Sequence, residues 1–365
     1  MRIFRLKKVH FSAMYDKKNK GNGTGEKTIM KFYLAPLEGI TGYIYRNALE
    51  KYFPGTDRYF TPFIAPDQNR ILRTKETKDV APENNHVQEL IPQILTNNAE
   101  YFLMTVRSLQ ELGYQEVNLN LGCPSGTVVT RGRGSGFLAY PDELDRFLEQ
   151  IFNGTDAKIS IKTRIGRDNM DDAFRLMEIY GKYPMSELII HPRTQKEFYR
   201  GVPHQEVFGE LTEHFWKTGK EYRIEVSEEI PVCYNGNILT VSDYQNLIAR
   251  FPDIDSVMLG RGIIANPGLI RQLKTGEPTD KKNLKGFHDE VLQGYREYLR
   301  EEKNSLFRMK EMWIYMSHLF TNHEKYMKKI RKAQSLAEYN CVVNNLFAEQ
   351  ELLPDGPARW NLPQK

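Results

Sequence analysis

Short apolar runs alternate with longer, mixed segments along residues 31–280. Eight of these runs have the length and the β-branched or alternating character of buried strands. Most of the gaps between them carry apolar residues at helical spacing, most clearly at 99–112, 142–151, 171–180 and 242–248. The last of these follows Thr240, a residue type that favours a helix start. The strands are predicted at 32–35, 59–64, 91–95, 117–121, 159–163, 188–190, 231–234 and 256–259.

Strand–helix alternation repeated eight times predicts a parallel α/β sheet, and eight units close most naturally into a (β/α)8, or TIM, barrel. An open doubly wound sheet is the alternative. The strands stop near residue 285, and helical spacing follows at 287–300, 306–320, 323–338 and 339–349. We therefore expect a barrel domain at 31–280 and a C-terminal helical domain at 281–365. One face of the second helix is predicted to be core: Met309, Met312, Trp313, Met316, Leu319 and Phe320.

Composition is that of an ordinary globular protein, with 40% apolar and 27% charged residues. No apolar run approaches the length of a membrane span. The cysteines Cys123, Cys233 and Cys341 are odd in number and far apart, which indicates a reducing, cytoplasmic setting without a disulfide framework or a metal site. Residues 1–30 are rich in Lys, Gly and Asn without apolar periodicity and are predicted to be a disordered basic extension.

The net charge of +4 conceals an uneven distribution. Residues 1–31 carry nine Lys and Arg against two Asp and Glu, residues 32–270 carry 25 against 32, and residues 271–365 carry 17 against 13. An acidic centre between basic ends indicates a polyanionic partner that is contacted at the edges. Solvated tails would give the same composition.

Polar, ionisable or glycine residues lie at the carboxyl ends of seven of the eight predicted strands, inside the strand or directly after it. Because the carboxyl ends of barrel strands meet at one open mouth, these residues should gather there and form the active site. Taken singly, each has an ordinary structural interpretation, such as a turn or a capped core histidine. They are Pro36-Leu37-Glu38, Gln93, Asn120 with Cys123, Lys162, His191 with Arg193, Asn235-Gly236-Asn237 and Gly260-Arg261.

These residue types suit a flavin better than a metal or a serine nucleophile. Metal ligation would need several converging His, Cys or carboxylate groups, and the serine elbow motif is absent from the sequence. A flavin ring needs amide and cationic partners along its polar edge, which Gln93 and Lys162 can provide. Its phosphate would lie after strands seven and eight, at 235–237 and 260–261, where Arg261 adds a charge-assisted bond.

Cys123 ends the apolar run 117–121 in a Gly-Cys-Pro turn. An ordinary thiol has a pKa of about 8.5 and is mostly protonated at neutral pH, so it can act as a general acid. A nucleophile is the alternative if the pKa falls. The glycine-rich stretch 131–136 that follows is predicted to be a flexible surface loop or, alternatively, a lid over the substrate.

The strand-end motifs, in their order along the chain, resemble the dihydrouridine synthases, flavin-dependent enzymes that reduce uridine in tRNA. The resemblance runs from about Phe32 to Pro267. The sequence departs from the family pattern at two positions. Gly42 stands where Asp is common, and Asn237 stands where Asp or Glu is common. The motifs are Ala35-Pro36-Leu37-Glu38-Gly39-Ile40-Thr41 with Arg46; Pro92-Gln93-Ile94; Asn120-Leu121-Gly122-Cys123-Pro124; Lys162-Thr163-Arg164; His191-Pro192-Arg193-Thr194 with Tyr199 and Gly201; Asn235-Gly236-Asn237-Ile238; and Gly260-Arg261-Gly262 with Pro267.

The resemblance implies a tRNA-dihydrouridine synthase with FMN at the barrel mouth and NADPH as the reductant. Cys123 would protonate C5 of the uracil after hydride reaches C6. Asn120 would hydrogen-bond the uracil edge, and Arg193 and Arg200 would hold the base or a phosphate. The resemblance also implies which residues bind FMN: Pro36, Leu37, Glu38, Gln93, Lys162, His191, Asn235, Gly236, Asn237, Gly260 and Arg261.

Four lysines in the C-terminal region share one helical face: Lys325, Lys328, Lys329 and Lys332. We expect this face to contact tRNA phosphates, although a solvated charged face is the alternative. A monomer is expected. Two other functions fit less well. One is a flavin barrel that acts on a small molecule such as a free pyrimidine, against which the basic face and the extra helical domain argue. The other is a non-catalytic RNA-binding protein, against which Cys123, Lys162 and His191 argue.

Overall fold

The computed structural model describes residues 29–221, 230–354 and 356, so the expected extension lies outside the described residues except for its last two. Nine parallel strands form one sheet in the order β3-β2-β1-β9-β8-β7-β6-β5-β4. The strands are β1 (Lys31–Leu34), β2 (Arg58–Phe60), β3 (Leu90–Ile91), β4 (Gln93–Ile94), β5 (Glu116–Leu121), β6 (Lys158–Arg164), β7 (Leu188–His191), β8 (Val232–Tyr234) and β9 (Ser256–Leu259).

Strands β3 and β4 are the two halves of one predicted strand, interrupted at Pro92. Proline has no N–H to donate to a ladder, so the strand changes partner there: β3 pairs with β2, and β4 pairs with β5. The Pro92 carbonyl still accepts the Asn118 N–H at 2.8 Å. Strand β1 pairs with both β2 and β9. The two ends of the strand order, β3 and β4, are joined through Pro92, so the ring closes. The predicted eight-unit barrel is confirmed, and the open sheet is wrong.

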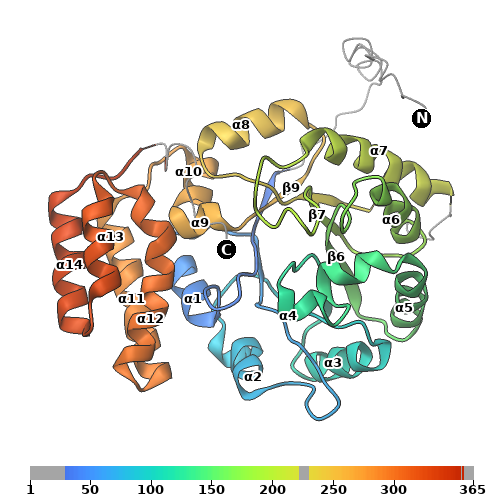
Figure 1. The fold of residues 1–365 in the computed structure, drawn as a ribbon, viewed down its shortest axis with the longest axis horizontal. Coiled ribbons are helices and arrows are strands. Elements are labelled where there is room, and N and C mark those ends of the chain that lie inside the picture. Colours follow the sequence, from blue (N-terminus) through green and yellow to red (C-terminus); the bar gives the residue numbers. More distant parts are fainter. Residues whose placement is uncertain (1–28, 222–229, 355, 357–365) are drawn as a thin grey trace.

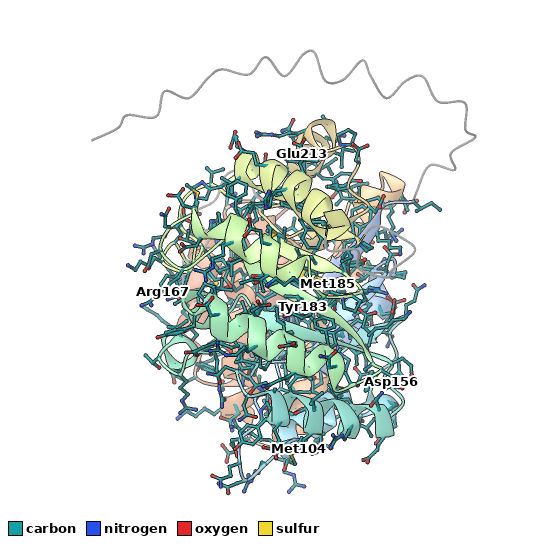
Figure 2. The ribbon with its side chains drawn as sticks, turned by 90° about the vertical axis from the view of Figure 1, so that its right-hand side faces the viewer. Met104, Asp156, Arg167, Tyr183, Met185 and Glu213 are labelled. Carbon is teal, nitrogen blue, oxygen red and sulfur yellow. The ribbon has the colours of Figure 1, made fainter. Side chains whose placement is uncertain are left out.

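Helices cover the outside of the ring (Figure 1). Figure 2 looks onto one flank, where α3, α5, α6 and α7 lie side by side, from Met104 on α3 to Glu213 on α7. The barrel helices are α1 (Tyr43–Tyr52), α2 (Thr74–Val80), α3 (Ala99–Glu111), α4 (Gly126–Val129), α5 (Pro141–Asn153), α6 (Asp172–Tyr180), α7 (Gln205–Glu221), α8 (Val241–Arg250), α9 (Arg261–Ala265) and α10 (Leu269–Thr275), with short 3-10 turns at Pro82–Asn84 and Gly134–Ala139.

The barrel has two apolar layers because successive strand residues point to opposite faces. One layer lies between the strands and the surrounding helices and includes Val117, Leu119 and Leu121 of β5. The other is small and fills the inside of the ring with seven residues: Tyr33, Ala35, Phe60, Ile91, Ile189, Cys233 and Met258. Above this plug the inner face of the ring is polar, with Asn118 and Asn120 on β5 beside Ser160 and Lys162 on β6.

Four further helices stand beside α1 at the end of the chain, drawn in orange and red in Figure 1. They are α11 (Lys281–Leu299), α12 (Glu302–Met316), α13 (His323–Lys332) and α14 (Leu336–Glu349), with a 3-10 turn at Ser317–Leu319. The expected helix at 323–338 is wrong at its end. The Ser335 side chain accepts the Glu338 N–H at 3.2 Å and so starts a new helix.

The apolar stripe predicted on the second of these helices, from Met309 to Phe320, is buried as expected. Phe287 on α11 packs edge-on against Tyr45 on α1, with ring centres 5.2 Å apart. The apolar core is therefore continuous from the barrel into the C-terminal helices. The division into a barrel domain at 31–280 and a C-terminal helical domain at 281–365 stays a prediction. Within the described parts of the chain, no helix is both long and apolar enough to cross a membrane.

Candidate functional site

A cavity of about 270 Å³ opens at the carboxyl ends of the strands. The loop after β1, the ends of β5 and β6, and helix α12 all contribute to its walls. Eight of the residues predicted from strand ends lie together in its lining: Pro36, Leu37, Glu38, Gln93, Asn120, Cys123, Lys162 and His191. The barrel register explains part of this gathering, because Asn120 lies directly opposite Lys162 and Arg164 directly opposite His191.

The inner face of the ring carries a chain of hydrogen-bonded amides below the cavity. Asn120 Nδ2 donates to Gln93 Oε1 at 2.7 Å, and Gln93 Nε2 donates to Asn118 Oδ1 at 2.8 Å. Asn118 Nδ2 then donates to the Ser160 hydroxyl at 3.0 Å. All four side chains are buried. Each buried amide thus has a hydrogen-bond partner in its neighbour. This row of hydrogen bonds fixes the orientation of Gln93 and Asn120 at the floor of the cavity.

Asn120 also builds the turn that carries Cys123. Its side-chain oxygen accepts the N–H groups of Gly122 and Cys123 at 3.0 and 2.9 Å. The Cys123 carbonyl in turn accepts the hydroxyl and the N–H of Ser135 at 2.8 and 3.1 Å. The main chain around the thiol is therefore held on both sides.

The glycine-rich stretch after Cys123 was expected to be a surface loop, and this expectation is wrong for residues 134–136, which are buried. Gly134 adopts φ +55°, and a Cβ there would lie 2.8 Å from the Cys123 carbonyl oxygen. Glycine is used here so that two segments of main chain can approach closely. The segment packs under the Cys123 turn and supports it.

Burial shifts the proton affinities of the ionisable groups that line the cavity. It raises the pKa of the Cys123 thiol, with the nearby Arg164 and Lys162 opposing the shift, so the thiol keeps its proton at neutral pH. It lowers the pKa of Lys162 to about 7, aided by Arg164. Burial and four surrounding cations hold the pKa of His191 well below its usual range, so the ring is neutral.

A cluster of cationic side chains borders the cavity next to His191. Arg193 Nη1 lies 3.0 Å from His191 Nε2, and Arg193 and Arg261 both reach the Asn237 side-chain oxygen, at 3.4 and 2.8 Å. Burial lowers the pKa values of Arg164, Arg193 and Arg261. Repulsion from Arg261 and Arg164 adds to the effect at Arg193, whose pKa falls to about 10. Asn237 accepts from two guanidinium groups without supplying negative charge, so the cluster is suited to an anionic ligand.

A further cationic side chain, that of Lys162, faces the cavity. Within the described residues, its ammonium group makes no hydrogen bond or ion pair with any side chain. Buried ammonium groups are costly unless they are paired. The unpaired charge is further evidence that the cavity accommodates an electron-rich group.

Arg193 and Arg200 lie outside the cavity lining, unlike the other predicted substrate residue, Asn120. The fully buried Arg193 guanidinium donates to the carbonyls of Arg200 and Gly201 at 3.0 and 2.7 Å. Arg200 is exposed and lies beside a separate, shallow pocket. Arg193 therefore holds the loop at 200–201 in place. Contact of Arg193 and Arg200 with the substrate stays a prediction.

The predicted phosphate residues also lie just outside the cavity lining. The buried Asn235 amide donates to the Met258 carbonyl at 2.8 Å, which ties β8 to β9. A Cβ at Gly236 would lie 2.0 Å from the Tyr234 hydroxyl, so only glycine fits. Arg261 lies 4.7 Å from the ring centre of Tyr199, which does line the cavity. Gly260 directly precedes Arg261, so this group forms the outer border of the site.

Several lining residues were not among the predicted site residues. Arg164 could have been found, because it shares the inner face of β6 with Lys162 and its Nε donates to the Gly122 carbonyl at 2.8 Å. Ile40, Gly122, Pro124 and Tyr199 stood in the family motifs without being chosen as site residues. Five others come from a loop and from a helix distant in sequence, where no local pattern marks them: Pro62, Phe63, Glu311, Ile314 and Tyr315.

The predicted basic face lies on α13, where Lys325, Lys328, Lys329 and Lys332 are all exposed. Lys325 lies 3.7 Å from Glu349 on α14, so its charge is partly compensated. Within the described residues, no three His, Cys, Asp or Glu side chains are grouped closely enough to hold a metal ion.

Comparisons with known proteins show the family of the chain. The family model described as dihydrouridine synthase matches residues 33–355. A probable tRNA-dihydrouridine synthase of Staphylococcus aureus is 25% identical over 88% of this chain and 94% of its own. The tRNA-dihydrouridine(16) synthase of Aquipseudomonas alcaligenes is 28% identical over 67% of this chain and 75% of its own.

Among solved structures, morphinone reductase superposes with a TM-score of 0.48 at 11% identity, covering 69% of this chain and 88% of that one. The match to the family model spans most of the chain, from within β1 to beyond α14. The chain therefore belongs to the dihydrouridine synthase family.

Proposed function

We propose that this protein is a tRNA-dihydrouridine synthase, which reduces the C5–C6 double bond of uridine in tRNA with FMN as cofactor and NADPH as reductant. The observation that carries the proposal is one cavity with a protonated thiol on one wall and a half-buried lysine on another. Family membership and the names of the relatives support the same reaction.

The cavity and its border fit FMN. The isoalloxazine ring would lie over Gln93 and Lys162, against Pro36, Leu37 and Glu38. Its phosphate would meet Arg261 and the glycine turns at 235–237 and 260–261. Bound there, FMN would supply hydride to C6 of the uracil and be restored by NADPH.

The protein's own groups then have separate tasks. Addition of hydride at C6 places negative charge on C5 and on the O4 edge of the uracil, so a nearby cation and a proton donor both stabilise the transition state. Lys162 provides the positive charge beside the flavin's polar edge. Cys123 holds the proton on Sγ, and the turn fixed by Asn120 and Ser135 presents that proton to C5.

Asn120 has a smaller direct role toward the uracil than the resemblance implies. Its oxygen already accepts two main-chain N–H groups and one of its N–H groups donates to Gln93, which leaves a single N–H for the base. We infer that Asn120 acts mainly by positioning Cys123 and Gln93, and that it donates one hydrogen bond to a uracil carbonyl.

The purified protein tests the proposal directly. It should carry a flavin spectrum that NADPH bleaches and that tRNA lacking dihydrouridine restores, with dihydrouridine appearing in the RNA. A free uracil or uridine that restores the spectrum as fast as tRNA does would instead support the small-molecule enzyme. A protein that binds tRNA but no flavin would contradict both enzymatic functions.

The lysine face on α13 gives a separate prediction. Replacing Lys325, Lys328, Lys329 and Lys332 by Ala should weaken tRNA binding and reduce the slope of log Kd against log salt, because each phosphate contact releases about one counterion. The loss of slope should be below four, since Lys325 is partly paired with Glu349. As a control, Lys282, Lys285 and Lys303 on α11 and α12 can be replaced together. An unchanged slope in the α13 variant would show that this face does not contact RNA.

A further inference from the structure

A second cavity, of about 320 Å³, lies beside the catalytic one. We call it the side pocket. Its walls come from the loops after β1 and β2, from α2, from the end of α11 and from Arg308 on α12. Glu38, Pro62 and Phe63 line both cavities, so the two spaces meet along a shared rim. A volume of this size is within the range of small-molecule sites, roughly 300–1,000 Å³.

The side pocket is rich in aromatic side chains. Tyr43, Phe63, Tyr295 and Tyr298 all line it. Tyr43 and Tyr298 meet edge to face, with ring centres 6.0 Å apart, so each holds the other in place. Tyr295 donates its hydroxyl to the Ile40 carbonyl at 3.3 Å, which satisfies its polar end. Aromatic walls of this kind bind flat rings by stacking, and every nucleobase has such a face.

The charges around the side pocket largely cancel. Lys75 pairs with Glu38 at 2.6 Å, and Arg308 with Glu311 at 3.0 Å. Asp79 is paired with the buried Arg46 at 3.1 Å. Arg73 pairs with Asp67 at 3.3 Å, and the Glu76 carboxylate accepts the main-chain N–H groups of Ala65 and Arg73. A pocket whose lining charges mostly have partners suits a neutral ring and not the phosphates of a dinucleotide.

One unpaired cation stands at the outer side of the pocket. The exposed Lys78 ammonium lies 5.2 Å from the Tyr298 ring centre. Within the described residues it forms no ion pair with any carboxylate. A neutral aromatic wall with a cation outside it matches one nucleotide, with its base inside and its phosphate outside.

We propose, resting on the proposed function, that the side pocket holds the base of a nucleotide directly adjacent to the target uridine in the same tRNA strand. The target uridine must leave its stack to reach Cys123. The neighbouring base then loses a stacking partner. The aromatic side chains of the side pocket, across the shared rim, take the place of that partner. The side pocket is thus a second nucleotide subsite that stabilises the opened strand.

Tyr298 provides a matched pair of variants. Tyr298→Leu removes the aromatic face and should weaken tRNA binding roughly 5- to 100-fold, the usual effect of losing one stacked base. Tyr298→Phe keeps the face and should bind tRNA like the wild type. FMN content and the Kd for NADPH should stay unchanged in both variants. An equal loss in both variants, or a weaker Kd for NADPH with normal tRNA binding, would overturn the proposal.

A second arm uses the wild-type protein, so it does not depend on the variant folding. tRNA that is abasic on one side of the target uridine should bind the wild type more weakly by the same factor. Tyr298→Leu should then lose nothing further. If an abasic site on either side of the target uridine weakens binding, and the two losses of affinity add up, the proposal of a subsite for one neighbouring base is overturned. If wild-type protein forms dihydrouridine while the losses add up, only the subsite fails; if it forms no dihydrouridine, the proposed function fails.

Discussion

Cys123→Ala should abolish nearly all dihydrouridine formation while the protein still binds FMN and accepts electrons from NADPH. Burial raises the pKa of the Cys123 thiol, so it carries a proton at neutral pH, and alanine has no proton to give. Loss of a positioned general acid typically costs about 10²- to 10⁴-fold in rate. The measurement is a single turnover, in which tRNA reoxidises the reduced flavin of each variant. Wild-type rates in Cys123→Ala would contradict the assignment.

The control for this variant is Cys123→Ser, which keeps a proton donor at the same position but a much weaker acid. Its rate should lie between those of the wild type and the alanine variant. The acid form of the thiol is the active form, and burial raises its pKa above the ordinary range for cysteine. With FMN bound, the wild-type rate should therefore stay flat through neutral pH and fall only in the alkaline range, as the thiol loses its proton. A rate that instead rises with pH as the thiol ionises would indicate a thiolate nucleophile.

The strands and much of the site could be predicted because both depend on local sequence. An apolar run with a period of two marks a strand, and the polar residues near the carboxyl end of a barrel strand lie at the mouth. Gln93, Lys162 and His191 were therefore placed correctly in the cavity lining. Glu311, Ile314 and Tyr315 could not be predicted in the same way. They reach the cavity because α12 packs over the mouth, which no local pattern encodes.

The partners of each side chain were also beyond prediction from sequence. Asn120 and Arg193 stand at strand ends and carry polar groups, which indicates contact with a ligand. In the folded chain both are buried, and buried polar groups must first satisfy the main chain around them. Asn120 therefore builds the Cys123 turn, and Arg193 holds the loop at 200–201. Position follows from the strand pattern, whereas hydrogen-bond partners depend on the tertiary packing.

Lys162→Met should weaken FMN binding roughly 10- to 100-fold at pH 7, the usual effect of losing a hydrogen bond to a charged group. It should also abolish the pH dependence of binding. Burial and Arg164 lower the pKa of Lys162 to about 7 in the protein without cofactor. An anionic ligand favours the protonated form, so FMN affinity should fall by up to tenfold per unit as the pH rises above 7.

Binding of FMN to cofactor-free protein between pH 7 and 9 isolates this effect, because the FMN phosphate, with a second pKa of about 6, is then fully ionised. Lys158→Met is the matched control, since Lys158 lies on the same strand β6 but is exposed at its start. That variant should keep both the affinity and the slope of the wild type. A slope that persists in Lys162→Met would show that another group takes up the proton, and unchanged FMN affinity would show that Lys162 does not contact the flavin.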